Sequence, residues 1–408
     1  MSRSWHVHLT GWLKIPWALD EDLRQVQMAL GDRVRWSSLP RARIVQAAWP
    51  SAVADSSPGA FRGKMVICQA DNPPSFYLGT EEFVRAAGRV DLWIARSREA
   101  LEQFRLLDLP AVLAPYTVDT AVFRPLPDPA GIRRQLGIGH GAFVIGNFHR
   151  DSEGADVRKP KLQKGPDVFL EIARKLQEQV PELTVLLAGP RRHWLLGALR
   201  KEDIPVVHVG GEPGDADDYG RNILPRERLN ELYQAMDCCV VSSRWEGGPH
   251  TVLEALAAGR PLVSSRVGMA RDVLPEACLF RSPDEAVGLL ASHASTGCLG
   301  KPCEEAAERA ASTHNLGALR DALSAAYANC RQGAASIGES ARSACAMVAG
   351  RVGLGNMPKN PGIENLRRRV CERAAKTSGP RGLIEFPAGG DMEQLMDCAA
   401  VIAAARRS

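Results

Sequence analysis

The chain has 408 residues, of which 45% are hydrophobic and 24% are charged, a composition typical of soluble globular proteins. This length favours two domains. The longest apolar runs are far shorter than the roughly 20 residues that cross a bilayer, and the N-terminus lacks a signal-peptide pattern. We therefore expect a cytoplasmic protein.

Ten cysteines are scattered along the chain without a CxxC pair or a cluster with histidine. Two of them, Cys238 and Cys239, are adjacent in an apolar run that is typical of a strand. This distribution favours buried, reduced thiols over a disulfide framework or a zinc site.

Residues 1–125 predict a first, smaller α/β domain. Short apolar runs rich in β-branched residues alternate there with helical segments such as TEEFVRAAG and REALEQFRLL. The strand candidates are RARIVQAAW, KMVICQA, DLWIARS and PAVLAPY. The segment VDTAVFRPLPDPAG, with three prolines, then predicts a linker to a second domain.

Residues 126–330 show the alternation of strands and helices more clearly. The strand candidates are AFVIGNF, LTVLLAGP, PVVHVG, CCVVSS and PLVSSRV. Helix-period segments separate them; in the first of these, Val168, Phe169, Ile172 and Leu176 fall on one face. Repeated β and α alternation predicts a parallel sheet with helices on both sides. We therefore predict a second Rossmann-like domain.

Residues 331–408 form a tail of less regular pattern, to which we assign no chemistry. It holds 12 basic and 7 acidic side chains, so it contains the excess positive charge behind the net +4. A basic run at 367–369, with Arg373 and Lys376, is typical of a solvated helix face. Peripheral contact with the inner face of an anionic membrane is the alternative. A nucleic-acid site is disfavoured because no aromatic residues are interleaved.

The stretch SSRWEGGPHTVLEALAAG places a glycine-rich loop between the strand CCVVSS and a helix. Pro249 favours the helix start and Gly259 its end. At the carboxyl edge of a parallel sheet, the first turn of such a helix offers unpaired amides and a partial positive charge. The amides of His250, Thr251 and Val252 therefore predict a phosphate site.

Two glutamates, Glu246 and Glu254, flank this anion site, and Gly247 and Gly248 allow close approach to the backbone. The two carboxylates can accept hydrogen bonds from hydroxyls on either side of the phosphate. A molecule with hydroxyls on both sides of a diphosphate is a nucleotide sugar. On spacing alone, two solvated glutamates in a plain strand-loop-helix remain an equal alternative.

The segment EGGPHTVLEALAAGRPLVSSRVG resembles the E-x7-E region of retaining glycosyltransferases of the GT-B fold, in glycosyltransferase family 4, the glycosyl transferases group 1. FVIGNFHRD with PKLQKGPDVFLEIA, VLLAGPRR and DLWIARS with VDTAVFRP resemble other parts of that family. The likeness covers about residues 90–330. It implies an α/β fold of two Rossmann-like domains facing across a cleft, with the acceptor side in the first and the donor site in the second.

The resemblance also implies roles for single residues. Glu246 would contact the transferred sugar near the reacting centre, and Glu254 would hold the ribose hydroxyls. Gly247, Gly248 and Thr251 would lie along the diphosphate and the sugar, beside the amide of His250.

Cationic residues near the first strand of the second domain would neutralise the departing diphosphate. The resemblance assigns this role to Lys164 and Arg150. The loop between them is longer than in most family members, so Arg158 is an alternative to Arg150. Many relatives place a histidine near the donor sugar, and here QADN at residues 69–72 occupies the corresponding position.

Other motifs carry less weight. GDADD at residues 214–218 could suggest a metal site, but GT-B enzymes handle the diphosphate with lysine, arginine and amides, so we predict neither metal nor cofactor. GIGHG at 137–141 precedes its strand and is typical of a turn rather than a dinucleotide loop. His149 either lines the ligand site or is a structural histidine.

The resemblance therefore implies a retaining hexosyl-type glycosyltransferase of polysaccharide or glycoconjugate biosynthesis. It would move a sugar from a nucleoside diphosphate sugar to a hydroxyl of a glycan, lipid or small molecule. The alternatives are a nucleotide-sugar epimerase of similar fold and a non-catalytic protein that binds a nucleotide sugar or a partner.

Overall fold

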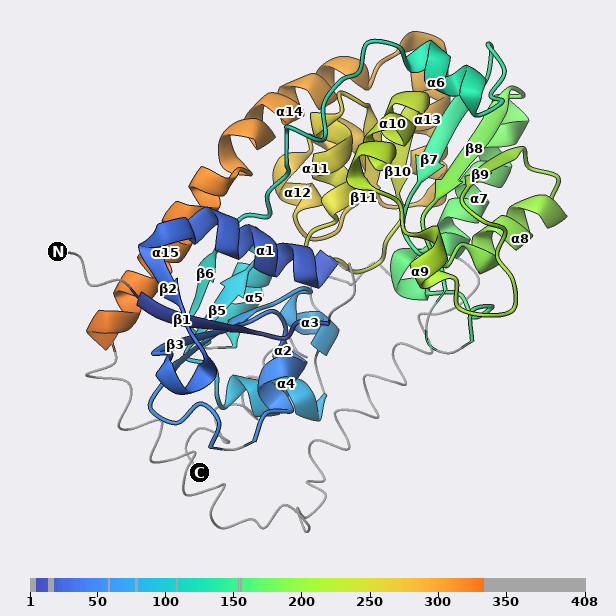
Figure 1. The fold of residues 1–408 in the computed structure, drawn as a ribbon. Helices are drawn as coiled ribbons and strands as arrows, with labels where there is room; N and C mark the ends of the chain where they lie inside the picture. Colours follow the sequence, from blue (N-terminus) through green and yellow to red (C-terminus); the bar gives the residue numbers. More distant parts are fainter. Residues whose placement is uncertain are drawn as a thin grey trace. The chain divides into compact units, whose positions relative to one another are not determined.

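A computed structural model of the chain describes residues 5–13, 18–57, 59–77, 80–107, 109–152, 154 and 156–333. They form two compact units (Figure 1). One contains the described residues up to Thr117 together with those from Leu316 onward, and the other is Val118–Asn315. Our expectations for the tail, including the basic run at 367–369, fall on residues outside those described.

The first unit is built on a six-stranded sheet whose described pairings are all parallel. In spatial order its strands are β2 (Val34–Trp36), β1 (Trp5–Thr10), β3 (Ile44–Ala47), β4 (Met65–Gln69), β5 (Leu92–Ala95) and β6 (Ala111–Leu113). The last four confirm the predicted strands. The order is that of a flavodoxin-like doubly wound sheet.

Helices cover both faces of this sheet. They are α1 (Ala18–Leu30), α2 (Pro50–Ala54), α3 (Pro74–Tyr77), α4 (Glu81–Ala87), α5 (Arg98–Leu106) and α15 (Leu316–Gly333), with single 3-10 turns η1 (Gly31–Arg33) and η2 (Leu39–Arg41). One apolar core joins α1 and α15 to the sheet. Side chains of α2, α4 and α5 build the core on the opposite face.

The boundaries between the units differ from our sequence-based ones. The second unit begins at Val118 rather than at residue 126, because Phe123 is buried against the ring of Tyr233 and Arg124 N donates to Asn230 Oδ1 at 3.2 Å. The helix α15, which we placed in the second domain up to residue 330, belongs to the first unit. Its Tyr327 is fully buried and meets Trp5 edge to face at 5.6 Å.

The second unit also holds a six-stranded parallel sheet. Its order is β12 (Leu279–Phe280), β11 (Leu262–Ser265), β10 (Cys238–Val241), β7 (Phe143–Asn147), β8 (Leu183–Ala188) and β9 (Val206–Val209). This is the Rossmann order, and the predicted α/β class is confirmed in both units. The winding direction reverses between β7 and β10, the point where such sheets bind ligands at their carboxyl ends.

Helices flank the second sheet as the alternation predicted. They are α6 (Pro129–Gln135), α7 (Pro166–Gln179), α8 (His193–Lys201), α9 (Tyr219–Asn222), α10 (Arg226–Ala235), α11 (His250–Ala257), α12 (Ala270–Val273), α13 (Pro283–Thr296) and α14 (Gly300–Thr313), with 3-10 turns η3 (Leu162–Lys164) and η4 (Glu276–Cys278). The apolar face predicted for α7 is buried, since Val168, Phe169, Ile172 and Leu176 are 4% exposed or less. Pro249 directly precedes α11 as its N-cap.

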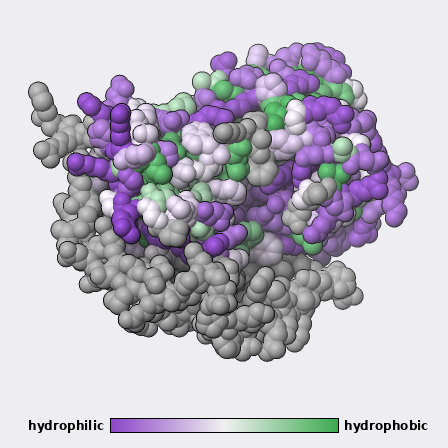
Figure 2. Space-filling view, turned by 60° about the horizontal axis from the view of Figure 1, so that its bottom comes forward, coloured by the Kyte–Doolittle hydropathy of each residue, from purple (hydrophilic) through white to green (hydrophobic). Residues whose placement is uncertain are grey.

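The polarity of the surface and the burial of the cysteines are those of a globular protein. Figure 2 shows hydrophilic side chains over most of the described surface on the face that it presents, with hydrophobic ones in small scattered groups. None of the described helices is long and apolar enough to cross a bilayer. Cys68, Cys238, Cys239, Cys278 and Cys303 are free and buried, as predicted, whereas Cys298 is free and exposed.

Candidate active site

The candidate site lies where β7 and β10 end side by side. Asn147 closes β7 and is followed by His149, while the segment from Ser242 to Glu246 follows β10 and leads into α11. Parallel neighbours bring these segments to one edge of the sheet. The residues predicted to bind the nucleotide sugar therefore come from regions of the sequence about a hundred positions apart. His149 and Thr251, for example, are separated by 102 positions.

The central contact of this edge is an ion pair between two predicted site residues. Lys164 Nζ lies 2.5 Å from Glu246 Oε1, which also accepts a hydrogen bond from Ser243 Oγ at 2.7 Å. Burial alone would raise the pKa of Glu246, but the Lys164 ammonium and the hydrogen bonds hold that pKa below its usual value. Glu246 is only 6% exposed, so it is a buried, ionised carboxylate.

The turn that carries Lys164 is fixed to the loop that carries Glu246. Gly165 adopts the left-handed conformation, with φ at 60°, and a Cβ there would lie 1.9 Å from Ser242 O. Arg244 pairs with both carboxylate oxygens of Asp167, at 2.8 and 2.6 Å. The backbone approach and the bidentate pair together set the distance between the ammonium and the carboxylate.

A second glycine shapes the loop before α11. Gly268 has φ of 43°, and a Cβ at this position would lie 2.3 Å from Glu246 O and 2.4 Å from Gly247 O. Met269 N donates to Gly247 O at 3.1 Å. The loop after β11 therefore packs against the backbone of the Glu246 loop. Only glycine fits at position 268, because a side chain would overlap that backbone.

Glu254 lies in the second turn of α11. Its Oε2 accepts a hydrogen bond from Tyr233 Oη at 2.8 Å. Burial, and then the Glu254 charge, raise the pKa of Tyr233 well above its usual value, so the phenol keeps its proton and stays a donor. The carboxylate of Glu254 thus has a fixed orientation on the helix whose first turn contains His250 and Thr251.

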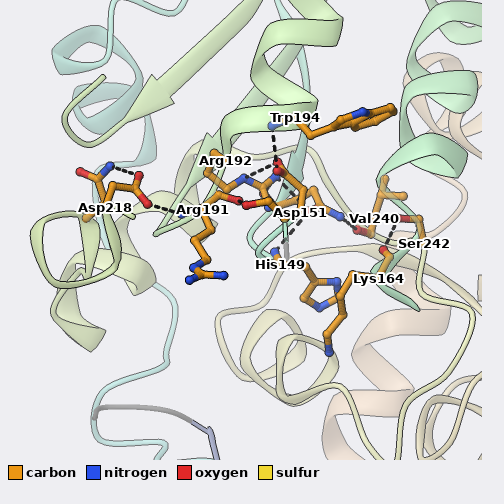
Figure 3. A network of polar contacts seen from close by, with 12 residues as sticks. His149, Asp151, Lys164, Arg191, Arg192, Trp194, Asp218, Val240 and Ser242 are labelled. Carbon is orange, nitrogen blue, oxygen red and sulfur yellow. Dashed lines mark hydrogen bonds and ion pairs between the residues drawn. The ribbon is translucent and has the colours of Figure 1, made fainter. Parts of the chain in front are cut away.

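His149 is hydrogen-bonded to the first turn of α11. Its Nε2 lies 3.1 Å from Thr251 Oγ1, and its ring extends to the same side as the Lys164 side chain (Figure 3). Burial, with the charges of Lys164 and Arg192, lowers the pKa of His149 to about 4, although the Glu246 charge acts to raise it. The ring is therefore neutral at neutral pH.

A buried arginine, Arg192, lies next to this site (Figure 3). Arg192 is fully buried, and its Nη2 donates to Asn147 O at 3.0 Å and to Asn147 Oδ1 at 3.1 Å. Asn147 in turn donates to Val240 O at 3.0 Å and accepts from His149 N at 3.2 Å. Asn147 therefore ties the ends of β7 and β10 to the loop after β8.

The carboxylate opposite Arg192 is that of Asp151, 3.6 Å from Arg192 Nε. Burial raises the pKa of Asp151 to about 6, although Arg192 and the backbone amides act to lower it. The sequence did not single out Arg192, Asn147 or Asp151. The run AGPRR contains the buried Arg192 next to Arg191, and no residue pattern separates the two.

The remaining cationic candidates have different surroundings. Arg150 follows His149 at the same edge and is partly buried. Arg158 forms an ion pair with Asp215, and both side chains are more than three-quarters exposed. The longer loop therefore directs Arg158 toward the loop after β9, and its phosphate role stays a prediction.

The carboxylates of GDADD have separate partners. Asp215 pairs with Arg158, Asp217 pairs with Arg191 Nη2 at 2.5 Å, and Asp218 accepts from Arg191 N at 2.8 Å. Within the part of the chain that the structure describes, no group of three or more His, Cys, Asp or Glu side chains is arranged to hold a metal ion.

The segment QADN lies in the first unit, at the carboxyl end of β4. Gln69 accepts a hydrogen bond from Arg96, Asp71 accepts one from Tyr77 Oη, and Asn72 Nδ2 donates to Asp71 at 3.1 Å. Within QADN only Asp71 and Asn72 are thus bonded to each other, while Gln69 is held by Arg96. Their relation to a donor sugar stays a prediction.

Residues 157–294 match the family model described as Glycosyl transferases group 1. The matched segment contains Lys164, the Glu246 loop and all of α11. It covers the part of the second unit in which the candidate site is concentrated.

Curated relatives match the chain over a similar region. The lipopolysaccharide core biosynthesis mannosyltransferase LpsB of Rhizobium meliloti is 31% identical over 166 residues, which are 40% of this chain and 42% of that protein. The D-inositol 3-phosphate glycosyltransferase of Kribbella flavida is 30% identical over 207 residues, 48% of this chain and 44% of that protein. The matches thus span less than half the length of these relatives.

Solved structures resemble the chain over most of its length. Anabaena Alr3699/HepE, solved in complex with UDP-glucose, has a TM-score of 0.63 at 15% identity and covers 80% of this chain and 100% of its own. The sucrose-phosphate synthase of Thermosynechococcus elongatus has a TM-score of 0.54 at 17% identity and covers 72% and 74%. The fold is GT-B, as the sequence predicted. At these identities the likeness concerns the fold alone.

Proposed function

We propose that the chain is a retaining glycosyltransferase of family 4. It transfers a sugar, of hexosyl type, from a nucleoside diphosphate sugar to an acceptor hydroxyl. The observation that carries the proposal is the buried Lys164–Glu246 ion pair at the switch point of the second sheet, beside the first turn of α11. The family match over residues 157–294 and the glycosyltransferase names of the curated relatives support it.

Negative charge grows on the diphosphate as the bond to the anomeric carbon breaks. The amides of His250 and Thr251 at the start of α11 carry partial positive charge and suit the growing negative charge. The Val252 amide, which our sequence-based prediction included, donates instead to Pro249 O at 3.0 Å. Lys164 supplies a full charge next to them, and Arg150 is the second cation in the proposal. Groups that are already oriented before the reaction stabilise such charge without reorganising.

The two glutamates act on the two ends of the donor. Glu246, ionised and buried, accepts hydrogen bonds from the transferred sugar and opposes the positive charge that develops on its ring. Glu254, held by Tyr233, accepts hydrogen bonds from the ribose hydroxyls. Thr251, Gly247 and Gly248 lie between them along the diphosphate.

In this proposal the acceptor attacks from the face that the diphosphate leaves, so the anomeric configuration is retained. The leaving phosphate helps to deprotonate the acceptor hydroxyl. Lysine, arginine and backbone amides handle the diphosphate, so neither a metal nor a cofactor takes part. The separate pairing of Asp215, Asp217 and Asp218 with arginines supports this view.

The first unit would supply the acceptor side, and a glycan, a lipid or a small molecule would provide the hydroxyl. A cytoplasmic protein, in peripheral contact with a membrane through its basic tail, would fit synthesis of a polysaccharide or glycoconjugate. The relatives named for lipopolysaccharide core biosynthesis and for D-inositol 3-phosphate support sugar transfer as the common activity.

Product analysis tests the proposal. The protein is incubated with UDP-, GDP-, ADP- or TDP-sugars and hydroxyl acceptors, and products are followed by mass spectrometry and by the anomeric coupling in NMR spectra. A new glycoside of retained configuration supports the proposal. An isomerised donor would identify an epimerase, and binding without any product would identify a non-catalytic protein.

A further inference from the structure

We infer that Ser243 positions the carboxylate of Glu246, so that the protein holds one of its oxygens and leaves the other for the transferred sugar. Ser243 is a positioning residue, because it acts on the sugar through Glu246. The inference deepens the proposed function and rests on it, since that proposal assigns the transferred sugar to Glu246.

The two oxygens of the Glu246 carboxylate have different surroundings. Oε1 lies 2.5 Å from Lys164 Nζ and 2.7 Å from Ser243 Oγ. An ionised carboxylate has no proton to donate, so the Ser243 hydroxyl is the donor in the second contact. Among the residues that the structure describes, no donor contacts Oε2. A carboxylate oxygen accepts about two hydrogen bonds, so Oε1 is saturated and Oε2 is the oxygen left for a ligand.

Ser243 constrains the carboxylate in a way that Lys164 alone does not. The ammonium of a lysine ends a flexible four-carbon stem and can follow a carboxylate that rotates. The hydroxyl of Ser243 is one carbon away from the backbone, so its place changes little unless the backbone moves. The hydrogen bond from Ser243 therefore fixes the rotation of the Glu246 carboxyl group and, with it, the direction of Oε2.

The backbone of Ser243 is itself held on two sides. Ser243 is fully buried, and its carbonyl oxygen accepts a hydrogen bond at 2.5 Å from Ser265 Oγ, at the end of β11. The preceding residue, Ser242, donates through its hydroxyl to Gly165 O at 2.9 Å, next to Lys164. The donor to Glu246 is thus fixed to the neighbouring strand and to the turn that carries the lysine. Groups oriented in this way before the reaction need not reorganise during it.

The same hydrogen bond favours the ionised form of Glu246. Burial acts to raise the pKa of Glu246, whereas Lys164, His149 and the Ser243 hydroxyl act to lower it, and the resulting pKa lies below the usual value. Loss of the hydroxyl should therefore raise this pKa and, at the same time, free the carboxyl group to rotate. A serine that only fills space would have neither effect.

The test compares Ser243→Ala with Ser264→Ala in the full chain. Ser264 is the matched control, because it is also fully buried and its hydroxyl donates to Ser265 O at 2.8 Å in the neighbouring strand. The substrate is the UDP-, GDP-, ADP- or TDP-sugar from which the wild-type protein forms a glycoside.

Ser243→Ala should lower kcat by about tenfold, the value of one hydrogen bond to a charged group. It should also move the acidic limb of the kcat/KM profile to higher pH, because that limb reports the Glu246 carboxyl of the free enzyme. Ser264→Ala should change neither. The matching nucleoside diphosphate, which lacks the sugar, should bind both variants as it binds the wild-type protein, by calorimetry.

Three results would overturn the inference while leaving the proposed function intact. The first is a kcat and a pH profile of Ser243→Ala equal to those of Ser264→Ala. The second is weakened binding of the nucleoside diphosphate by Ser243→Ala, which would show a general defect of the site. The third is a pKa of Glu246 at or above that of an ordinary glutamate, in a ¹³C NMR titration of the unliganded wild-type protein.

The NMR titration needs neither a ligand nor a variant, so it tests the inference even if Ser243→Ala fails to fold. Failure of the wild-type protein to transfer a sugar from any of the four kinds of donor would instead count against the proposed function.

Discussion

Lys164 and Glu246 are 82 positions apart in the chain, and their Nζ and Oε1 atoms lie 2.5 Å apart at the carboxyl edge of the second sheet. The Glu246 side chain is 8% exposed and the Lys164 side chain is 21% exposed. Removal of either partner leaves the other with an uncompensated charge in a poorly solvated place. The two residues nevertheless have different roles in the proposed reaction, so their variants should fail differently.

Glu246→Gln should mainly lower kcat, because the amide keeps the shape but loses the charge that opposes the developing positive charge on the sugar.

Lys164→Ala should mainly weaken donor binding and also lower the free energy of unfolding by about 3 kcal/mol, since Glu246 stays behind as a buried charge. The control is Lys175→Ala, a lysine that pairs with Glu171 and Asp284 on the surface. Wild-type kinetics in both site variants, on a proven donor, would show that the site is elsewhere.

Gly165→Ala should strongly destabilise the second unit. At this residue φ is 60°, and the added Cβ would meet Ser242 O at 1.9 Å, so the backbone must shift. Gly137→Ala is the matched control: φ is 70° there, but nothing lies within 4 Å of the added Cβ. The control should lose only about 1 kcal/mol from left-handed strain. Urea unfolding measures both, and equal losses would contradict a role for the close contact with Ser242.

The parts of the fold that the sequence predicted are those with local, periodic signals. The buried strands around Val144 and Val240, the apolar face of α7 and the loop that carries Glu246 all have such signals. The strand β1 was missed because His6 and His8 occupy alternate positions on one face, so its apolar residues do not form a continuous run. The return of α15 to the first unit depends on contacts of Tyr327 with distant residues, which no local pattern reports.

The candidate site could likewise be predicted only in part. The glutamate spacing and the segment PKLQKGPDVFLEIA, which carries Lys164, predict residues that would contact a ligand. Residues that hold them, such as Arg192 and Asn147, have no sequence signature, because burial of an arginine depends on which neighbours cover it. Arg191 and Arg192 are adjacent, yet one forms a partly exposed ion pair with Asp217 and the other is fully buried.

The pH dependence of stability should report Asp151. Its pKa is about 6 in the folded protein and 3.8 in the usual reference state, so the folded state binds more protons between these values. This group therefore stabilises the fold most below about pH 4, and its contribution is lost as the pH rises toward 6. The difference in unfolding free energy between the wild-type protein and Asp151→Asn should fall by about 2 kcal/mol from pH 4 to pH 7. A difference that does not vary with pH would contradict the raised pKa.

Activity should survive chelators. The carboxylates of Asp215 and Asp217 are committed to Arg158 and Arg191, and the diphosphate is assigned to Lys164 and the amides of α11. Turnover in EDTA should therefore equal turnover without it, and Asp215→Asn should keep wild-type activity. An enzyme silenced by EDTA and restored by manganese would place the diphosphate site at Asp215 and Asp217 instead.

Binding alone tests the donor site before any acceptor is known. A matching nucleoside diphosphate should stabilise the folded chain by about 2.7 kcal/mol at a hundredfold excess over its dissociation constant. The free nucleoside should stabilise it far less, because it keeps the ribose contact with Glu254 but lacks the charge that Lys164 and the first turn of α11 attract. Glu254→Ala should weaken both ligands, whereas Lys164→Ala should selectively weaken the diphosphate. Thermal shifts with UDP, GDP, ADP and TDP would show this pattern and identify the base. If none of the four binds a folded preparation, the site does not hold a nucleotide and a role without catalysis becomes the better account.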